Sequence, residues 1–380
     1  MRWLILTSST GTGHNMRAES LRLWAAENAG ADIEVRVQQT LETTHPLYRF
    51  GVGLYNTIQR RAPRLHHLYF NYLEIAGMHR HPGRIIGGDT YGAAVAAFAP
   101  QRIISVHAHT NHGFFELARR ALPLSPPRCI TYCGELFGGY GFSRHWANPG
   151  ADGFIGATPE VCAAAHAVGT PAERVYPGGF LLRPSLYLPE AEADSQAAAV
   201  SAELRLDRGV FTVLLSTGLA GANNHLPILR HLAASGKKLQ VVALCAGNIA
   251  ARKAVEAFAA AHPSLTIRAL GQTDRILALL RLASVVVARP GTGATSEAIL
   301  TGTPLIHNGI GGIMPQELIT VQYCRHHGCA LTGRSAREVA GHVLRLRDDS
   351  DLAAELRTRL RAACPAGSPS RIIRWILERN

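Results

Sequence analysis

Long hydrophobic runs are missing from this sequence of 380 residues. The apolar runs, such as Val210–Leu215 and Ser284–Ala288, have the length of a strand and fall far short of the roughly 20 residues that cross a bilayer. The N-terminal segment Met1–Thr7 contains an apolar run too short for the core of a signal peptide. We therefore expect a chain that is not exported and does not span a membrane.

A cysteine framework is missing as well. The seven cysteines are an odd number, and the close pairs are Cys129/Cys133 and Cys324/Cys329. Neither spacing has the second half that a zinc site needs, so we expect no disulfide and no metal ion. The pair His326–His327, which follows Cys324, is interpreted as a solvated helix end.

Acidic residues are fewer than basic ones, 27 against 39, which gives a formal net charge of +12. An excess of this sign favours an anionic partner: nucleic acid, anionic lipid or a phosphorylated ligand. Paired Cys/His fingers and an aromatic strand motif are absent, and the basic residues are dispersed along the chain. We therefore expect no nucleic-acid partner, and lipid and phosphorylated ligands remain.

The composition is that of a folded globular protein, with 47% hydrophobic residues and neither tandem repeats nor low-complexity runs. A chain of this length is more naturally two domains than one. Residues 4–7 form a short apolar run, then a glycine loop, then a stretch from Asn15 with apolar positions at helical spacing. Further strands are expected in the first half at Glu34–Val37, Arg84–Ile86, Arg102–Val106, Arg128–Tyr132 and Gly153–Ile155.

A second alternation of strands and helices starts near residue 210. Its expected strands are Val210–Leu215, Gln240–Cys245, Thr266–Leu270, Val285–Ala288 and Pro304–His307. This pattern predicts an α/β protein with two doubly wound parallel sheets. We predict an N-terminal domain over 1–185, a linker and helix over 186–208, a C-terminal domain over 209–365, and an amphipathic helix over 366–380.

The loop after the expected strand Val285–Ala288 is rich in glycine. Gly291 and Gly293 allow close approach of a ligand, and a helix expected to start near Ala294 points free N–H groups outward. This arrangement suits a diphosphate. Glu297, expected in the first helical turn, either accepts hydrogen bonds from a ribose diol or is a charge favoured by the helix dipole.

The segment Ala288–Leu300, followed by Gly302–Ile306 and Ile313–Glu317, resembles the C-terminal domain of family 28 glycosyltransferases of GT-B fold. The likeness is to the branch of monogalactosyldiacylglycerol synthase and processive diacylglycerol glucosyltransferase. It implies two Rossmann-like domains with an interdomain cleft. In that branch a Gly-Gln-Glu motif contacts the donor sugar, and here Pro315 replaces the glycine while Thr320 stands where an Asn is usual.

The loop Ser9–Asn15 is similar to the Gly-x-Gly-His loop on the acceptor side of that family. The resemblance makes His14 a candidate base, since an inverting transfer must remove a proton from the acceptor hydroxyl. The helix dipole keeps an imidazole at a helix N-terminus neutral, as a base requires. The alternative to a base is a polar residue that only caps the helix. Thr131–Trp146 resembles a further family segment, in which Glu135 and His145 are candidates for base or acceptor contacts.

Other segments match the family in the expected order, over residues 4 to about 335. His107 and His109 occupy a strand end equivalent to another family histidine, and each is equally well an ordinary loop residue. The segment Leu270–Asp274 resembles the loop that reads uracil, and Ser216–Gly221 can add phosphate donors. The residues expected to bind the donor are Gly11, Gly13, Gly218, Gln272, Thr273, Gly291, Thr292, Gly293, Thr295, Glu297, Gln316 and Glu317.

Aromatic and basic residues interleave in the segment Tyr48–Phe70. Such a stretch can rest on an anionic lipid surface, with the rings among the headgroups. The alternative is a helix pair with a solvated basic face. We expect an anionic membrane surface as a partner, and a cytoplasmic protein that is peripheral on the inner face of the plasma membrane.

Together these features predict an inverting enzyme that moves a hexose from a UDP-sugar to a lipid hydroxyl, with diacylglycerol as the acceptor implied by the resemblance. The UDP-sugar is a substrate, and no further cofactor is expected. One alternative is a UDP-N-acetylglucosamine-dependent transferase to a polyprenyl or lipid A type acceptor. Others are a UDP-sugar 2-epimerase and a nucleotide-sugar-binding protein without catalysis.

Overall fold

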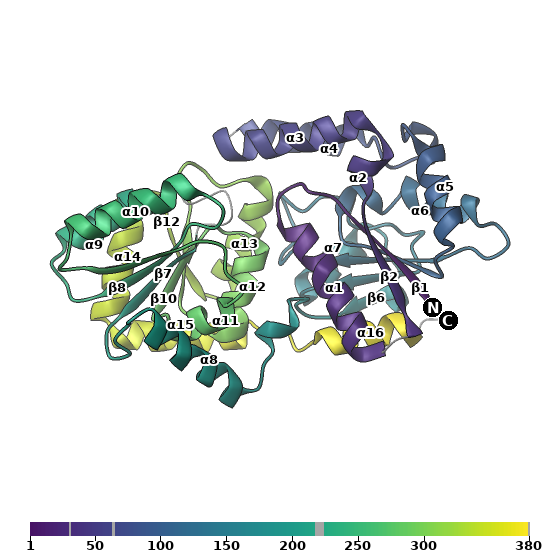
Figure 1. Ribbon diagram of the computed structural model, residues 1–380. Coiled ribbons are helices and arrows are strands. Elements are labelled where there is room, and N and C mark those ends of the chain that lie inside the picture. Colours follow the sequence, from purple (N-terminus) through teal and green to yellow (C-terminus); the bar gives the residue numbers. More distant parts are fainter. Residues whose placement is uncertain (30–31, 63–64, 217–223, 379–380) are drawn as a thin grey trace. The chain divides into compact units, whose positions relative to one another are not determined.

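The computed structural model describes residues 1–29, 32–62, 65–216 and 224–378 of the chain. The chain divides into two compact units. In Figure 1 the ribbon is coloured by residue number. The first unit is Met1–Pro184 together with Met314–Ile319 and the chain from Pro365 onward. The second is Ser185–Ile313 with Thr320–Cys364.

The first unit is built on a parallel sheet of six strands in the order β2-β1-β3-β4-β5-β6. Residues of β1, β3, β4 and β5 are almost all buried, as expected for parallel strands covered by helices on both faces. The strands are β1 (Arg2–Thr7), β2 (Glu34–Gln39), β3 (Arg102–Ser105), β4 (Arg128–Cys133), β5 (Gly153–Gly156) and β6 (Val175–Pro177).

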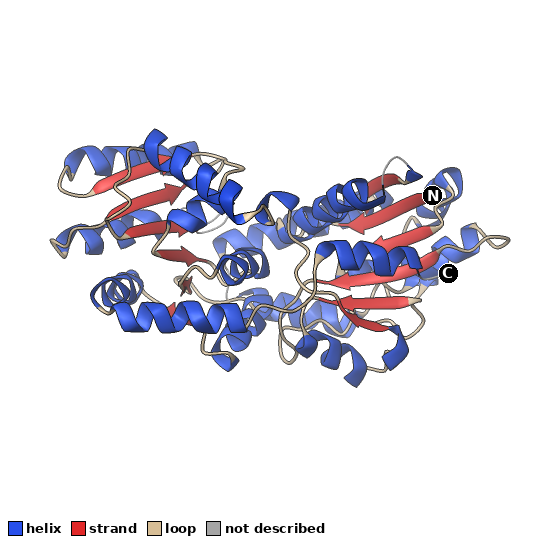
Figure 2. Cartoon of the chain, turned by 90° about the horizontal axis from the view of Figure 1, so that it is seen from below, coloured by secondary structure: helices blue, strands red, loops and turns tan. Residues whose placement is uncertain are grey.

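Helices cover both faces of each sheet, as Figure 2 shows in blue around the red strands. Those of the first unit are α1 (Gly13–Ala29), α2 (Thr40–Thr44), α3 (Pro46–Arg61), α4 (His66–Ala76), α5 (Gly88–Phe98), α6 (Gly113–Ala121), α7 (Pro159–Ala167) and α16 (Pro369–Glu378). Short 3-10 turns lie at η3 (Pro82–Arg84), η4 (Ala108–Thr110), η5 (Ala172–Arg174) and η6 (Pro184–Leu186).

The last helix, α16, packs beside α1 in the first unit (Figure 1). Its apolar face is formed by Ile372, Ile373 and Ile376, which are fully buried. Trp375 stacks on Tyr176 at 5.3 Å between ring centroids. The C-terminal helix thus completes the core of the same unit to which the N-terminal strand and helix belong.

The second unit has a parallel sheet of six strands in the order β12-β11-β10-β7-β8-β9. The strands are β7 (Thr212–Ser216), β8 (Gln240–Leu244), β9 (Thr266–Leu270), β10 (Val285–Ala288), β11 (Leu305–Asn308) and β12 (Ala330–Gly333). The helices are α8 (Glu190–Glu203), α9 (His225–Ala234), α10 (Ile249–Ala261), α11 (Ile276–Leu282), α12 (Thr292–Thr301), α14 (Ala336–Asp348) and α15 (Ser350–Ala362). Helix α13 (Pro315–His326) belongs to the first unit up to Ile319 and to the second from Thr320. The described helices include none long and apolar enough to cross a membrane.

The strand order reverses once in each sheet, and this positions the candidate sites. In the first unit β1 lies between β2 and β3, and in the second β7 lies between β8 and β10. Ligands of open parallel sheets bind beyond the carboxyl ends of the strands at such a reversal. The loops to examine are therefore those after β1, β3 and β10. Two doubly wound, Rossmann-like units confirm the predicted α/β fold class.

The strand predicted at Arg84–Ile86 is wrong. Arg84 ends the 3-10 turn η3, and Ile86 lies in a turn that precedes α5. Ile85 is buried in the core of the first unit, so its hydrophobicity reflects a loop that packs inward. Gly87, with φ of 77°, turns the chain directly into α5.

Candidate functional site

His14 lies in the first turn of α1, directly after the glycine loop that leaves β1. Gly11 has φ of 74°, a left-handed conformation that glycine adopts without strain. The Nδ1 atom of His14 lies 2.8 Å from the backbone oxygen of Val106, which follows β3. A carbonyl only accepts hydrogen bonds, so Nδ1 carries the proton and Nε2 keeps its lone pair.

The charge state of His14 is set by its surroundings. The pKa of His14 is lowered to about 3, mainly by burial and then by the positive charge of Arg17, while the hydrogen bond to Val106 opposes both effects. Arg17 stands one helical turn after His14, is nearly buried, and donates a hydrogen bond of 2.8 Å to the backbone oxygen of Gly134. His14 is therefore a neutral imidazole that can accept a proton at Nε2.

His107 is the nearest aromatic neighbour of His14, with ring centroids 4.5 Å apart and the rings edge to face. Its Nδ1 accepts the backbone N–H of His109 at 3.2 Å, which leaves the proton on Nε2. That Nε2 then donates to the hydroxyl of Thr10 at 2.7 Å. The loops after β1 and β3 are thus joined by two hydrogen bonds, one through each histidine.

Further histidine rings extend from this pair through the first unit. Ring centroids lie 5.7 Å apart for His107 and His109, 5.1 Å for His109 and His145, and 5.6 Å for His79 and His109. Burial is the main cause that lowers the pKa of His79, His109 and His145 to about 3. In the described part of the chain, neither ring nitrogen of His79 has a hydrogen-bond partner.

Glu135 follows β4 and is buried, with 6% of its surface exposed. Burial raises the pKa of its carboxyl, and the charge of Arg17 opposes this rise. The carboxyls of Glu135 and Glu317 both raise the pKa of Tyr55 on α3, after the larger effect of burial. The structure therefore places Glu135 near Arg17, the same side chain that acts on His14.

In the second unit the glycine loop after β10 leads into α12. The helix begins at Thr292 with Gly291 as its N-cap, at φ −81° and ψ 146°. The first N–H groups of a helix have no partner within it. A Cβ atom on Gly291 or Gly293 would meet no protein atom within 4 Å, so packing against the protein does not require glycine there. Both positions leave room for a ligand at the positive end of the helix.

The expected position of Glu297 in the first turn of this helix is wrong. Because α12 begins at Thr292 and not near Ala294, Glu297 lies in the second turn, and the first turn contains no acidic residue. The helix dipole acts mainly on the first turn. The helix dipole therefore explains a carboxylate at Glu297 less well than it would if Glu297 lay in the first turn.

Two residues at this site escaped the sequence analysis. Arg289, at the end of β10, donates 2.9 Å and 2.8 Å hydrogen bonds to the backbone oxygens of Ile310 and Gly312. His307, on β11, is fully buried and its Nε2 lies 3.1 Å from the hydroxyl of Thr295. Burial, and then the charge of Arg289, lower the pKa of His307 to about 3. Their positions directly beside the glycine loops were the available signal.

Gln316 and Glu317 stand in the first turn of α13. The carboxylate of Glu317 accepts the backbone N–H of Met314 at 2.9 Å, which is one half of a capping box at the helix start. Glu317 thus has a structural function independent of any sugar. The side-chain oxygen of Gln316 is buried, and no partner for it occurs among the residues that the structure describes.

The uracil loop predicted after β9 is a bend beyond the carboxyl end of that strand. Gln272 is exposed, and the hydroxyl of Thr273 accepts the backbone N–H of Arg275 at 3.1 Å. Gly218, predicted to donate to a phosphate, lies outside the described residues. The geometry brings Gly291, Thr295 and Arg289 together, whereas the role of the β9 loop stays a prediction.

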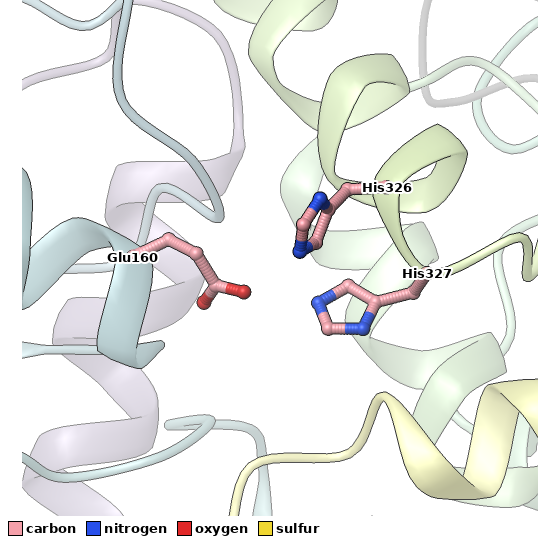
Figure 3. A group of neighbouring side chains, drawn as sticks. All are labelled: Glu160, His326 and His327. Atoms are coloured by element: carbon pink, nitrogen blue, oxygen red, sulfur yellow. The ribbon is translucent and has the colours of Figure 1, made fainter.

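Figure 3 draws three side chains of types that bind metal ions: Glu160, His326 and His327. Glu160 lies in the first turn of α7 in the first unit, and in the second unit His326 is the last residue of α13 and His327 follows it. The rings of His326 and His327 lie 5.0 Å apart and nearly perpendicular. Within the second unit the two imidazoles stand without Glu160, and two are fewer than the three or four protein ligands of a zinc site. The expectation that no metal binds stays a prediction.

Two Rossmann-like units with a glycine loop at the sheet reversal of each define a protein of GT-B fold. No family model matches the chain. It is 22% identical over 236 residues to a processive diacylglycerol beta-glucosyltransferase of Bacillus pumilus, covering 62% of this chain and 59% of that protein. It is 24% identical over 353 residues to monogalactosyldiacylglycerol synthase 1 of Arabidopsis thaliana, covering 89% and 63%.

Solved structures agree on the fold. The chain matches MurG of Acinetobacter baumannii with a TM-score of 0.63 at 13% identity, over 99% of both chains. It matches Anabaena Alr3699/HepE in complex with UDP-glucose with a TM-score of 0.56 at 14% identity, over 100% and 98%. The predicted resemblance to family 28 glycosyltransferases of GT-B fold is confirmed. The chain spans about three-fifths of the length of the curated relatives it matches.

Proposed function

We propose that the protein is an inverting glycosyltransferase that moves a hexose from a UDP-sugar to a lipid hydroxyl, with diacylglycerol as the first acceptor to test. The names of its relatives support a hexose and a diacylglycerol acceptor, and the UDP-glucose bound to the structural neighbour HepE supports the donor class. The observation that carries the proposal is the hydrogen bond from His14 Nδ1 to Val106, because it presents the basic Nε2 at the sheet reversal of the first unit.

The chemistry assigned to His14 is general base catalysis. Its Nε2 takes the proton from the acceptor hydroxyl while the oxygen attacks the anomeric carbon from the face opposite the diphosphate. The bond between that carbon and the diphosphate oxygen breaks, and UDP leaves with the electron pair. The carbonyl of Val106 then stabilises the imidazolium through Nδ1–H.

In this proposal the groups that bind the diphosphate and the ribose lie in the second unit. The N–H groups at the start of α12, at Thr292 and Gly293, hold the diphosphate and stabilise the charge of the leaving group. Glu297 accepts the ribose hydroxyls, and Gln316 contacts the sugar through its unpartnered oxygen. Thr295 shares its hydroxyl with His307, which orients it within the first helical turn.

The test is a panel of UDP-sugars incubated with a total lipid extract, scored by release of UDP and by mass spectrometry of the lipid product. Transfer of a hexose to a diacylglycerol supports the proposal. A product on a polyprenyl or lipid A type acceptor would keep the transferase activity and rule out diacylglycerol as the acceptor. Free UDP and an epimerised sugar formed without acceptor would instead identify an epimerase.

We also propose that α3 and α4 dock the first unit on an anionic membrane surface. Both helices expose bulky apolar side chains at helical spacing, among them Phe50 (71% exposed), Leu68 (70%) and Ile75 (81%). Between residues 45 and 86 the sequence has six arginines and a single acid, Glu74. Apolar side chains flanked by arginine match a lipid surface with anionic headgroups, here that of the cytoplasmic leaflet.

The double variant Phe50→Ser/Ile75→Ser is expected to lose most binding to vesicles of phosphatidylcholine and phosphatidylglycerol, by roughly tenfold or more, because two large apolar side chains no longer enter the headgroup layer. Co-sedimentation at low salt measures this. The matched control is Leu124→Ser, since Leu124 is fully exposed outside these helices. Equal binding of the double variant and the control would refute the docking surface.

A further inference from the structure

The loop that carries His14 is held by side chains from two different helices. Glu42 of α2 accepts the backbone N–H of Ser9 at 2.6 Å and the hydroxyl of Ser8 at 3.2 Å. This carboxylate fixes the start of the loop. The helix that carries it, α2, packs on the strands β1 and β2.

Asn56 of α3 holds the middle of the same loop with both ends of its amide. Its Nδ2 donates to the backbone oxygen of Ser9 at 2.8 Å, and its Oδ1 accepts the N–H of Gly11 at 2.9 Å. The side chain therefore binds the loop as a neighbouring strand would. Thr10, between these two points, accepts from His107, and His14 follows three residues after Gly11.

The helix that carries Asn56 has two distinct faces. Leu47, Phe50 and Leu54 are exposed and share one face at a spacing of three and four residues. At 100° per residue, Val52 and Asn56 lie on the opposite face, where Val52 is buried in the core of the unit. One rigid helix thus connects the exposed apolar face to the loop of the candidate base.

We propose that Asn56 is a positioning residue through which docking of α3 on an anionic lipid surface orders the glycine loop and sets His14 for catalysis. This inference rests on the docking surface and transfer activity proposed above. An amphipathic helix gains most of its stability from packing of its apolar face. The outer apolar face of α3 is exposed, so a lipid surface supplies the missing packing, and Asn56 passes the added order to Ser9 and Gly11.

The experiment compares wild type, Asn56→Ala and Asn56→Asp with mixed phosphatidylcholine and phosphatidylglycerol vesicles present or absent. Asn56→Asp keeps the acceptor for the N–H of Gly11 and removes the donor to Ser9. The matched control is Asn28→Ala, an exposed asparagine of α1 whose amide donates to the backbone oxygen of Trp24 in the same helix. Two readouts are taken: amide hydrogen exchange of residues 11–14, and kcat and KM for a water-soluble short-chain diacylglycerol.

In wild type and Asn28→Ala, vesicles are expected to slow exchange in the loop and to raise kcat about tenfold with little change in KM, because misplacement of a catalytic group costs mainly kcat. Both Asn56 variants should bind vesicles and UDP as wild type does, yet lose both responses. Equal vesicle responses in wild type and Asn56→Ala would overturn the inference, as would wild type that binds vesicles without slower exchange. Slower exchange without any UDP release supports the coupling and refutes the proposed activity.

Discussion

The backbone oxygen of Val106 decides which nitrogen of His14 can take a proton. It holds Nδ1–H at 2.8 Å, so the basic nitrogen is Nε2 in every neutral molecule. Burial and the neighbouring Arg17 keep the ring uncharged. A base of this kind is present in its reactive form at all ordinary pH values, although its intrinsic basicity is low.

This environment makes a prediction about the pH dependence of transfer. Since the pKa of His14 is about 3, protonation of the free enzyme at this residue removes activity only as the pH falls through about 3. The acid limb of kcat/KM attributable to His14 is expected well below pH 5, measured by UDP release in the range where the fold is intact. An acid limb centred near pH 6.5, absent in a His14→Gln variant with residual activity, would contradict the assigned environment.

Several residues of the site were visible in the sequence because glycine and histidine stand directly after expected strands. His14, Gly291 and Thr295 belong to this group. Arg17, Asn56 and His307 were not found, because their roles depend on contacts with Gly134, Gly11 and Thr295 that only the fold creates. No local spacing signals such a contact.

At the scale of elements, a side chain joins the loops that follow two neighbouring strands in each sheet. His14 joins the loops after β1 and β3, and Arg289 joins the loops after β10 and β11. Gly311 and Gly312 have φ of 84° and 112°. The two hydrogen bonds from Arg289 add to the backbone bond from Gly312 to Gly309 and help to fix the conformation of this loop.

The variant Arg289→Gln is expected to weaken UDP binding about tenfold, because two charge-assisted hydrogen bonds to the loop after β11, at Ile310 and Gly312, are lost. Isothermal titration with UDP measures the effect. Arg289→Lys keeps the charge but cannot donate to both oxygens at once, so its affinity for UDP should lie between those of Arg289→Gln and wild type. The exposed Arg230 on α9 provides the control Arg230→Gln. Unchanged UDP affinity in Arg289→Gln would exclude the positioning role.

Element prediction from the sequence worked for every strand of the two sheet interiors, which are buried runs of apolar residues even where they have four residues. The strands after which the candidate loops follow, β1, β3 and β10, were all expected. Two short strands, β6 (Val175–Pro177) and β12 (Ala330–Gly333), were not identified, because they lie at the ends of the sheets and are only partly buried. The false strand at Arg84–Ile86 shows the converse, since the buried Ile85 belongs to a loop.

For the whole molecule, the distribution of buried histidines is uneven. Burial lowers the pKa of seven histidines in the first unit: His14, His66, His79, His107, His109, His112 and His145. In the second unit the same direction holds for His225 and His307. The first unit therefore holds more side chains that must remain uncharged to stay buried.

Acid is expected to unfold the first unit before the second. Each of these groups has a folded pKa below the unfolded value near 6.5, so the unfolded chain binds more protons below that pH and stability falls as the pH drops from about 6.5 toward 3. The loss is on the order of 1 kcal/mol per pH unit for each fully buried group. Hydrogen exchange followed from pH 7.5 to 5 measures the two units separately.

A matched pair of variants tests the cause. His79 is buried, and its ring nitrogens have no partner among the described residues, so His79→Phe should reduce the acid sensitivity of the first unit. His231→Phe replaces an exposed ring on α9 and should leave the acid sensitivity of the first unit unaltered. If both units lose protection at the same pH, the histidines do not govern acid stability.

The central claim is that the chain transfers a hexose from a UDP-sugar to a lipid hydroxyl with His14 as the base. The most direct test is UDP release and glycolipid formation from a UDP-hexose and diacylglycerol in anionic vesicles, for wild type and His14→Ala. The account predicts a glycolipid of inverted anomeric configuration from wild type. His14→Ala should retain UDP affinity and lose at least about a hundredfold in kcat. Equal turnover by the two proteins, or UDP release without a glycolipid, would contradict it.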